Sequence, residues 1–127
     1  NYTFYNDQTL FTSTSTTLFN ITQAGKYYLE WYSPSIRTDH VWSRLYNITD
    51  SAVVTYATKG YGNDTNYWNT QITRGAAVLD IDVDTQYKIQ AYSTVDDNIA
   101  EGYGARSPTD SVTYEEYTIV KIYKLGV

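Results

Sequence analysis

The chain has 127 residues, of which 42% are hydrophobic and 18% charged, and it contains no cysteine. This length predicts one domain with a single core, and the lack of cysteine excludes disulfides and thiolate metal sites. The net charge of −5 opposes binding to nucleic acid, which needs clustered Lys and Arg, and no apolar run approaches the roughly 20 residues of a membrane-spanning helix.

Residues 1–17 are interpreted as an extended N-terminal arm and its tether. The arm reads NYTFYNDQTLF, and its apolar candidates for contact with another strand are Tyr2, Phe4, Leu10 and Phe11. The tether, TSTSTT at 12–17, is hydroxyl-rich and offers little to a core. We expect the arm to pair with a neighbouring subunit; the alternative is that it folds back onto its own sheet, because six tether residues span roughly 20 Å.

Residues 18–127 are predicted to form the folded domain. Alternation of apolar and polar residues between turn signals predicts eight strands, near 18–22, 26–33, 40–48, 52–58, 68–73, 76–83, 86–94 and 113–125. The core-facing positions of this pattern are Tyr27, Leu29, Trp31, Leu79, Ile81, Val83, Tyr87, Ile89 and Ala91. Eight short antiparallel strands without a helix predict an all-β, two-sheet jelly-roll sandwich.

Four segments along the chain carry a family resemblance: TLFNITQAGKYYLEW, SRLYNITDSAVV, AVLDIDVDTQYKIQAYST and the terminal YTIVKIYKL. In this order they resemble the jelly-roll heads of the complement and tumour-necrosis-factor superfamily, especially microbial and phage tail-fibre relatives, over about residues 18–127. The resemblance implies a non-enzymatic extracellular binding or assembly module, usually trimeric. The chain departs from this pattern because only the short arm and tether precede the head.

Motifs that would carry catalysis or metal binding are absent or incomplete. Asp80, Asp82 and Asp84 have the spacing that begins an EF-hand, but Thr85 and Ala91 stand where that loop needs Gly and Glu. His40 is the single histidine, and no nucleophile motif surrounds any serine. We therefore expect no catalytic residues, no metal and no cofactor, and we expect the chain not to be an enzyme.

Four N-x-Thr sequons occur, at Asn1, Asn20, Asn47 and Asn63. Their number exceeds the roughly two expected by chance and favours N-glycosylation of a secreted chain. Threonine-rich strands also generate sequons passively, so both interpretations stay open. The lack of methionine fits a processed mature protein or a fragment. The expected location is extracellular or surface-exposed.

Tyrosine is the commonest aromatic residue, with 15 copies. Several aromatic residues lie on the parity opposite the predicted core or beside the Gly- and Asn-rich loop: Tyr28, Tyr32, Tyr61, Tyr67, Trp68 and Tyr92. Exposed aromatic rings can stack on sugars or become buried in a subunit interface, because they offer apolar area with a polar tip. The alternative is that some of them belong to the core.

Two functions follow from these features. The first is a structural protomer that donates its N-terminal strand to the next subunit and so builds a pilus-like filament from copies of itself. The second is a trimeric head, of a phage tail fibre or a complement-like protein, that binds a receptor or a glycan through exposed aromatic residues. The detachable arm favours the filament, and the family resemblance favours the head.

Overall fold

The computed structural model describes residues 11–13, 18–36, 40–61, 70–93 and 118–126. These residues form strands and no helix, so the all-β prediction is confirmed. The strands are β1 (Phe11–Ser13), β2 (Phe19–Ile21), β3 (Gly25–Ile36), β4 (His40–Asn47), β5 (Ala52–Tyr56), β6 (Gly60–Tyr61), β7 (Thr70–Ile81), β8 (Thr85–Ser93) and β9 (Ile119–Lys124).

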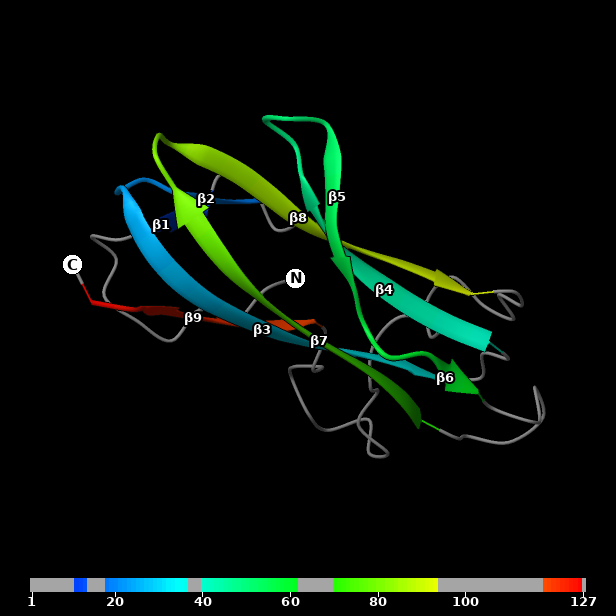
Figure 1. The fold of residues 1–127 in the computed structure, drawn as a ribbon. Coiled ribbons are helices and arrows are strands. Elements are labelled where there is room, and N and C mark those ends of the chain that lie inside the picture. Colours follow the sequence, from blue (N-terminus) through cyan, green and yellow to red (C-terminus); the bar gives the residue numbers. More distant parts are fainter. Residues whose placement is uncertain (1–10, 14–17, 37–39, 62–69, 94–117, 127) are drawn as a thin grey trace, which may run out of the picture.

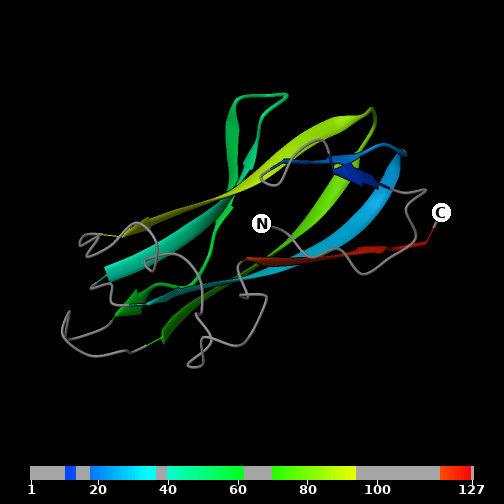
Figure 2. The same ribbon diagram turned by 180° about the vertical axis from the view of Figure 1, so that it is seen from behind.

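The strands form two antiparallel sheets that pack face to face, as Figures 1 and 2 show from opposite sides. The larger sheet has the order β1-β2-β8-β4-β5, with β6 also paired to β4, and the smaller has the order β7-β3-β9. The chain changes sheet before and after β3, before and after β7, and again before β9. This alternation places strands that are distant in sequence side by side, as in a jelly roll.

The core lies between the two sheets. The residues of β3 that were predicted to face the core do so. Tyr27, Leu29 and Trp31 are fully buried, whereas the residues between them face outward. The opposite sheet supplies buried residues that include Phe19 and Tyr87, whose rings stack with centroids 5.8 Å apart. Burial of one face of each sheet provides the main stabilisation of such a sandwich.

The strands predicted at 68–73 and 76–83 are one continuous strand, β7, so this division was wrong. Gly75 falls between the two predicted strands, but it pairs with Trp31 in the middle of the β3–β7 ladder. A Cβ atom at Gly75 would lie 2.0 Å from Cζ2 of Trp31. Gly75 is therefore required by the close approach of the indole ring and does not mark a turn.

The indole also carries a buried polar contact between the sheets. Its Nε1 donates a hydrogen bond to Oγ of Ser43 at 2.9 Å, and this hydroxyl lies 2.7 Å from Oγ1 of Thr73. The contact joins β3, β4 and β7, and it satisfies an indole N–H that would otherwise be buried without a partner.

Other strand boundaries differ from the predictions. The strand predicted at 52–58 ends at Tyr56, and Gly60–Tyr61 forms the short strand β6 beside β4. Val83 is exposed because it follows the end of β7, and Ala91 is exposed near the end of β8. The last strand begins at Ile119, and residues 113–117 of the predicted strand lie outside the described residues.

Of the predicted arm and tether, residues 1–17, the structure describes only the three residues of β1. Phe11 pairs with Ile21, Thr12 with Asn20 and Ser13 with Phe19, all within one chain. At these three residues the chain pairs with its own sheet, and the contact of Phe11 with a neighbouring subunit stays a prediction. The other arm residues, Tyr2, Phe4 and Leu10, lie outside the described residues.

Candidate functional site

The outer face of the larger sheet carries a row of aromatic and cationic side chains along β4. Val41, Ser43 and Leu45 point into the core, so the residues between them, Trp42 and Arg44, point outward. This alternation follows from the two-residue period of a strand. Because β4 pairs with β8 on one side and with β5 and β6 on the other, its outer side chains lie near the centre of the sheet.

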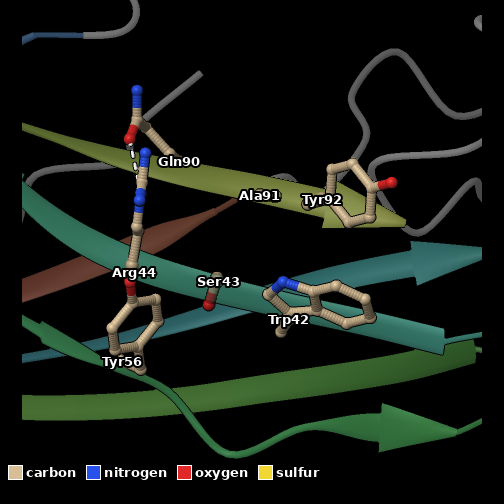
Figure 3. Close-up of a pocket in the computed structure, with 7 residues that line it drawn as sticks. All are labelled: Trp42, Ser43, Arg44, Tyr56, Gln90, Ala91 and Tyr92. Atoms are coloured by element: carbon tan, nitrogen blue, oxygen red, sulfur yellow. Dashed lines mark hydrogen bonds between the residues drawn. The ribbon is translucent and has the colours of Figure 1, made fainter. Parts of the chain in front are cut away.

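A shallow cavity of about 380 Å³ lies on this face, and Figure 3 shows the side chains around it. Its lining comes from β4, β5 and β8: Trp42, Ser43, Arg44, Tyr56, Gln90, Ala91 and Tyr92. Ala91 has no polar side-chain atom, and the Ser43 hydroxyl is bonded inward to Trp31 and Thr73. The outward-facing chemistry of the cavity therefore comes from three aromatic residues, one guanidinium and one carboxamide.

Cross-strand pairing sets the positions of these side chains. Trp42 lies opposite Tyr92, and their ring centroids are 4.9 Å apart with an interplanar angle of 41°. Arg44 lies opposite Gln90 on β8, and its Nε donates a hydrogen bond to Oε1 of Gln90 at 2.7 Å. On β5, Tyr56 lies opposite Arg44. The cavity thus has an aromatic part and a hydrogen-bonding part.

Cations gather around the aromatic rings of this face. Nζ of Lys59 lies 5.9 Å from the centroid of the Trp42 ring. The Tyr46 ring has the guanidinium carbon of Arg44 at 5.5 Å and Nζ of Lys88 at 5.4 Å. Such cation–π contacts orient the rings and hold positive charge at the surface.

The acidic side chains of the described residues lie elsewhere. Glu30 and Asp80 belong to the strands of the smaller sheet, and Asp50, Asp82 and Asp84 lie in turns. The strands β4, β5, β6 and β8 contain no acidic residue. Although the whole chain carries a net charge of −5, the described part of this face is cationic.

The aromatic residues predicted to lie at the surface fall into separate groups. Tyr61 and Tyr92 are 59% and 55% exposed, and Tyr92 lines the cavity. Tyr61 packs against His40 at the edge of the same sheet, with ring centroids 4.6 Å apart. Tyr67 and Trp68 lie outside the described residues.

Tyr28 and Tyr32 lie on the outer face of the smaller sheet, where both are half-buried. The Tyr32 ring has Arg74 and Lys121 each 5.4 Å from its centroid. The Tyr28 hydroxyl donates a hydrogen bond to Oε2 of Glu30 at 3.2 Å. These two tyrosines therefore already make contacts on their own sheet, and neither lies near the cavity on β4.

Of the side chains that supply the outward-facing chemistry of the cavity, sequence reasoning missed Trp42, Arg44, Tyr56 and Gln90. The alternation in HVWSRLYN was a usable signal, because it places Trp42 and Arg44 on one face of the predicted strand at 40–48. Tyr56 joins them only through the pairing of β4 with β5, which includes a register shift at Leu45 and Tyr46. Parity within one strand does not reveal such a contact.

Two of the four sequons lie in the described residues. Nδ2 of Asn20 donates a hydrogen bond to Oδ1 of Asp84 at 3.2 Å. Asn47 is only 9% exposed, and its Nδ2 donates a hydrogen bond to Oδ2 of Asp50 at 2.8 Å. Asn1 and Asn63 lie outside the described residues.

The aspartate residues of the predicted acidic face do not gather around one point. Asp80 forms an ion pair with Lys26 at 3.5 Å, and Asp84 accepts the hydrogen bond from Asn20. Within the described residues, no group of three or more His, Asp or Glu side chains is arranged to hold a metal ion.

A scan against models of protein families matches no family, and a search of curated proteins finds no similar sequence. In the part of the chain that the structure describes, no helix is long and apolar enough to span a membrane. The function is therefore inferred from the chemistry of the cavity and its surroundings.

Proposed function

We propose that this chain is a non-enzymatic, extracellular or surface-exposed carbohydrate-binding head, and that the outer face of β4 and β8 is its binding surface. One observation carries the proposal: aromatic rings and hydrogen-bonding groups line the same shallow cavity on a rigid sheet. This is the glycan-binding function that the sequence offered as an alternative to the filament.

Both parts of the cavity suit a sugar. The C–H faces of a pyranose ring are apolar and pack against aromatic rings such as Trp42 and Tyr92, while its hydroxyl groups exchange hydrogen bonds with polar side chains. Arg44 and Gln90 supply donors and acceptors beside the rings. The cavity volume of about 380 Å³ lies within the usual range for small-molecule sites and is large enough for one or two sugar residues.

The sheet also holds the site in place before any ligand arrives. Trp42 and Arg44 lie on a central strand bonded on both sides, and the Arg44–Gln90 hydrogen bond fixes one of the polar side chains. A preorganised site loses less conformational entropy on binding than a loop that must become ordered. This matters for sugars, because each sugar contact contributes little free energy.

A glycan array followed by titration calorimetry tests this proposal. We expect the wild-type chain to bind selected oligosaccharides, and we expect Trp42→Ala and Tyr92→Ala each to weaken binding by at least about tenfold. Tyr123→Ala is the matched control, because Tyr123 is 50% exposed on the outer face of the smaller sheet. Absence of binding to every glycan, or equal losses in Trp42→Ala and Tyr123→Ala, would reject the proposal.

The edge of the smaller sheet favours a second candidate function, the filament built by strand addition. β9 is the last strand in the order β7-β3-β9, so none of the described strands pairs with its outer edge. Tyr123 and Leu125 at this edge are exposed apolar residues. An arm strand carrying Tyr2, Phe4 and Leu10 would supply both backbone hydrogen bonds and apolar contacts there.

Removal of residues 1–10 tests the filament, since β1 begins at Phe11 and stays intact. If the arm links subunits, native assemblies seen by negative-stain microscopy become monomers after truncation, because a heterologous donor–acceptor contact is lost. Adding the peptide 1–10 to the truncated chain should then raise its melting temperature. Assemblies of unchanged size would show that the arm does not link subunits.

A further inference from the structure

Arg44 is one of the residues that line the cavity. Its Nε is bonded to Oε1 of Gln90, and its guanidinium carbon lies over the Tyr46 ring. Among the described residues, no side chain or carbonyl accepts a hydrogen bond from the two terminal nitrogens, Nη1 and Nη2. These nitrogens form a planar pair of donors with the geometry that binds the two oxygens of a carboxylate.

From this arrangement we infer that the glycan bound at this site is acidic, and that Arg44 binds a carboxylate of a uronic or sialic acid residue through Nη1 and Nη2. The inference rests on the proposed carbohydrate-binding function and adds the chemical class of the ligand. Gln90 acts as a positioning residue, because its bond to Nε fixes the plane of the guanidinium group.

The spacing on the strand fits one sugar ring. Trp42 and Arg44 are two residues apart on β4, and such positions are separated by about 6.6 Å along a strand. A pyranose ring packed on Trp42 or Tyr92 would therefore bring its carboxylate next to Arg44. Figure 3 shows the two rings on one side of the cavity and Arg44 with Gln90 on the other.

The charge around the cavity favours an acidic ligand over a neutral one. Lys59 and Lys88 lie on the same face, at the rings of Trp42 and Tyr46, and the strands of this face contain no acidic residue in the described part. The acidic side chains of the described residues lie on the smaller sheet or in turns, and 9 of the 14 acidic residues of the chain lie outside the described residues. Charge-assisted hydrogen bonds to a carboxylate are about twice as strong as neutral ones.

Nucleic acid and phosphate-rich surfaces fit the site less well. Recognition of a phosphate backbone requires several cations that bind successive phosphates. Here one guanidinium faces a cavity bounded by aromatic rings, and the two lysines lie over rings. A single planar donor pair beside stacking surfaces is suited to one carboxylate on one sugar.

Matched acidic and neutral sugars test the inference with the full chain. Oligogalacturonate and sialyllactose are each compared with their methyl ester, which removes the charge and keeps the sugar. Titration calorimetry should show at least about tenfold tighter binding of the acid form in at least one pair, with a difference that shrinks as salt is raised. The pair that shows the difference identifies the source of the carboxylate.

Two variants of Arg44 test whether this residue recognises the carboxylate. In Arg44→Gln the ratio of acid to neutral affinity should fall to about one, and in Arg44→Lys it should be intermediate, because charge is kept but the planar donor pair is lost. Lys121→Gln on the smaller sheet removes one positive charge elsewhere and should leave the ratio unchanged. Circular dichroism and melting curves confirm that each variant is folded.

The outcomes separate this inference from the proposed function. Equal affinity of the wild-type chain for acid and neutral forms would overturn the acidic-ligand inference and leave carbohydrate binding intact. A preference for the acid form that persists in Arg44→Gln would also overturn it, because the recognition would then lie elsewhere. Binding of neither form in either pair, together with an empty glycan array, would overturn both.

Discussion

The indole of Trp31 occupies the space where residue 75 would carry a side chain. Gly75→Ala would place Cβ 2.0 Å from Cζ2 and 2.2 Å from Cη2 of this fully buried ring. The ring cannot move easily, because its Nε1 is bonded to Ser43. We expect Gly75→Ala to lower the free energy of unfolding by about 3 kcal/mol or more, measured by urea denaturation.

Gly60 provides the matched control for this substitution. A Cβ atom there would meet the nearest atom, Cβ of Gln71, at 3.4 Å, which is an ordinary contact. Gly60→Ala should change the free energy of unfolding by less than about 0.5 kcal/mol. If the two alanine variants were equally stable, the close packing of Trp31 on β7 would be incorrect.

Tyr87 makes the fold sensitive to alkaline pH. Burial raises the pKa of its hydroxyl to about 12, and the nearby charge of Asp50 adds to the increase, while a hydrogen bond with Thr85 opposes it. In the unfolded chain this pKa is near 10. The folded state therefore holds the proton more tightly, and its stabilisation is complete below pH 10 and lost as pH rises through 12.

Comparison of the wild-type chain with Tyr87→Phe isolates this effect. The unfolding free energy of both proteins is measured by denaturant titration between pH 8 and about pH 12. That of the wild type should fall more steeply above pH 10, because phenylalanine has no proton to lose. Parallel pH profiles would show that Tyr87 does not titrate with a raised pKa.

Sequence patterns predicted only some of the residues that form the candidate site. The outward parity of Tyr92 was predicted, because alternation within one strand is visible in the sequence. The contacts of Trp42 with Tyr92 and of Arg44 with Gln90 depend on the register between β4 and β8, which joins residues 50 and 46 positions apart in the chain. Sequence periodicity carries no information about that register.

At the scale of elements, the turn after β4 determines whether the Asn47 sequon is accessible for glycosylation. Both side-chain atoms of Asn47 bond within this turn: Nδ2 to Oδ2 of Asp50, and Oδ1 to the backbone N–H of Asp50 at 2.9 Å. A glycan on Nδ2 would compete with the first bond and would need space around a side chain that is 9% exposed. We expect Asn47 to remain unmodified in the folded protein.

Peptide mapping of protein secreted from a eukaryotic host tests this expectation. Enzymatic release of N-glycans in heavy-oxygen water converts each modified Asn to labelled Asp, so occupied sequons are identified one by one. The Asn20 sequon serves as the internal comparison, because its side chain is half-buried and lies on the outer side of β2. A labelled Asp at position 47 in folded protein would contradict the proposed turn geometry.

Strand positions were predicted better than strand ends. The predicted strand at 26–33 lies within β3, and those at 40–48 and 86–94 agree closely with β4 and β8, because their apolar and polar residues alternate regularly between turn signals. The division of β7 failed because a glycine between two strand-like runs is compatible with either a turn or a close contact with a ring. Only the tertiary structure shows that Gly75 makes the ring contact. The register of the β1–β2 pairing could not be predicted, because the hydroxyl-rich residues of β1 have no apolar alternation.

At the scale of the whole molecule, the described acidic side chains are dispersed and give no metal site. We therefore expect a chelator such as EDTA to leave the melting temperature of the full chain unchanged, since only a metal bound to the folded state would raise it. A fall of several degrees on chelation, reversed by added calcium, would show that calcium stabilises the fold.

The two-sheet sandwich was predictable from the number and spacing of the strands, but the order of strands in each sheet was not. Pairings such as β2 with β8 and β3 with β9 join segments far apart in the chain. The pairing of β4 with β8 places Arg44 and Lys88 beside the same Tyr46 ring, and Lys59 lies at the Trp42 ring. The placement of these side chains depends on strand pairing and has no signature in the linear sequence.

Mapping of the proposed sugar-binding surface by NMR tests the central claim most directly. Isotope-labelled protein is titrated with the tightest glycan from the array, and shifts of backbone amides and indole N–H groups are followed. We predict that the shifts concentrate on β4, β8 and the end of β5, with the Trp42 indole affected and the buried Trp31 indole unchanged. Shifts concentrated on β3, β7 and β9, with β4 and β8 unaffected, would contradict the claim that the outer face of the larger sheet binds sugars.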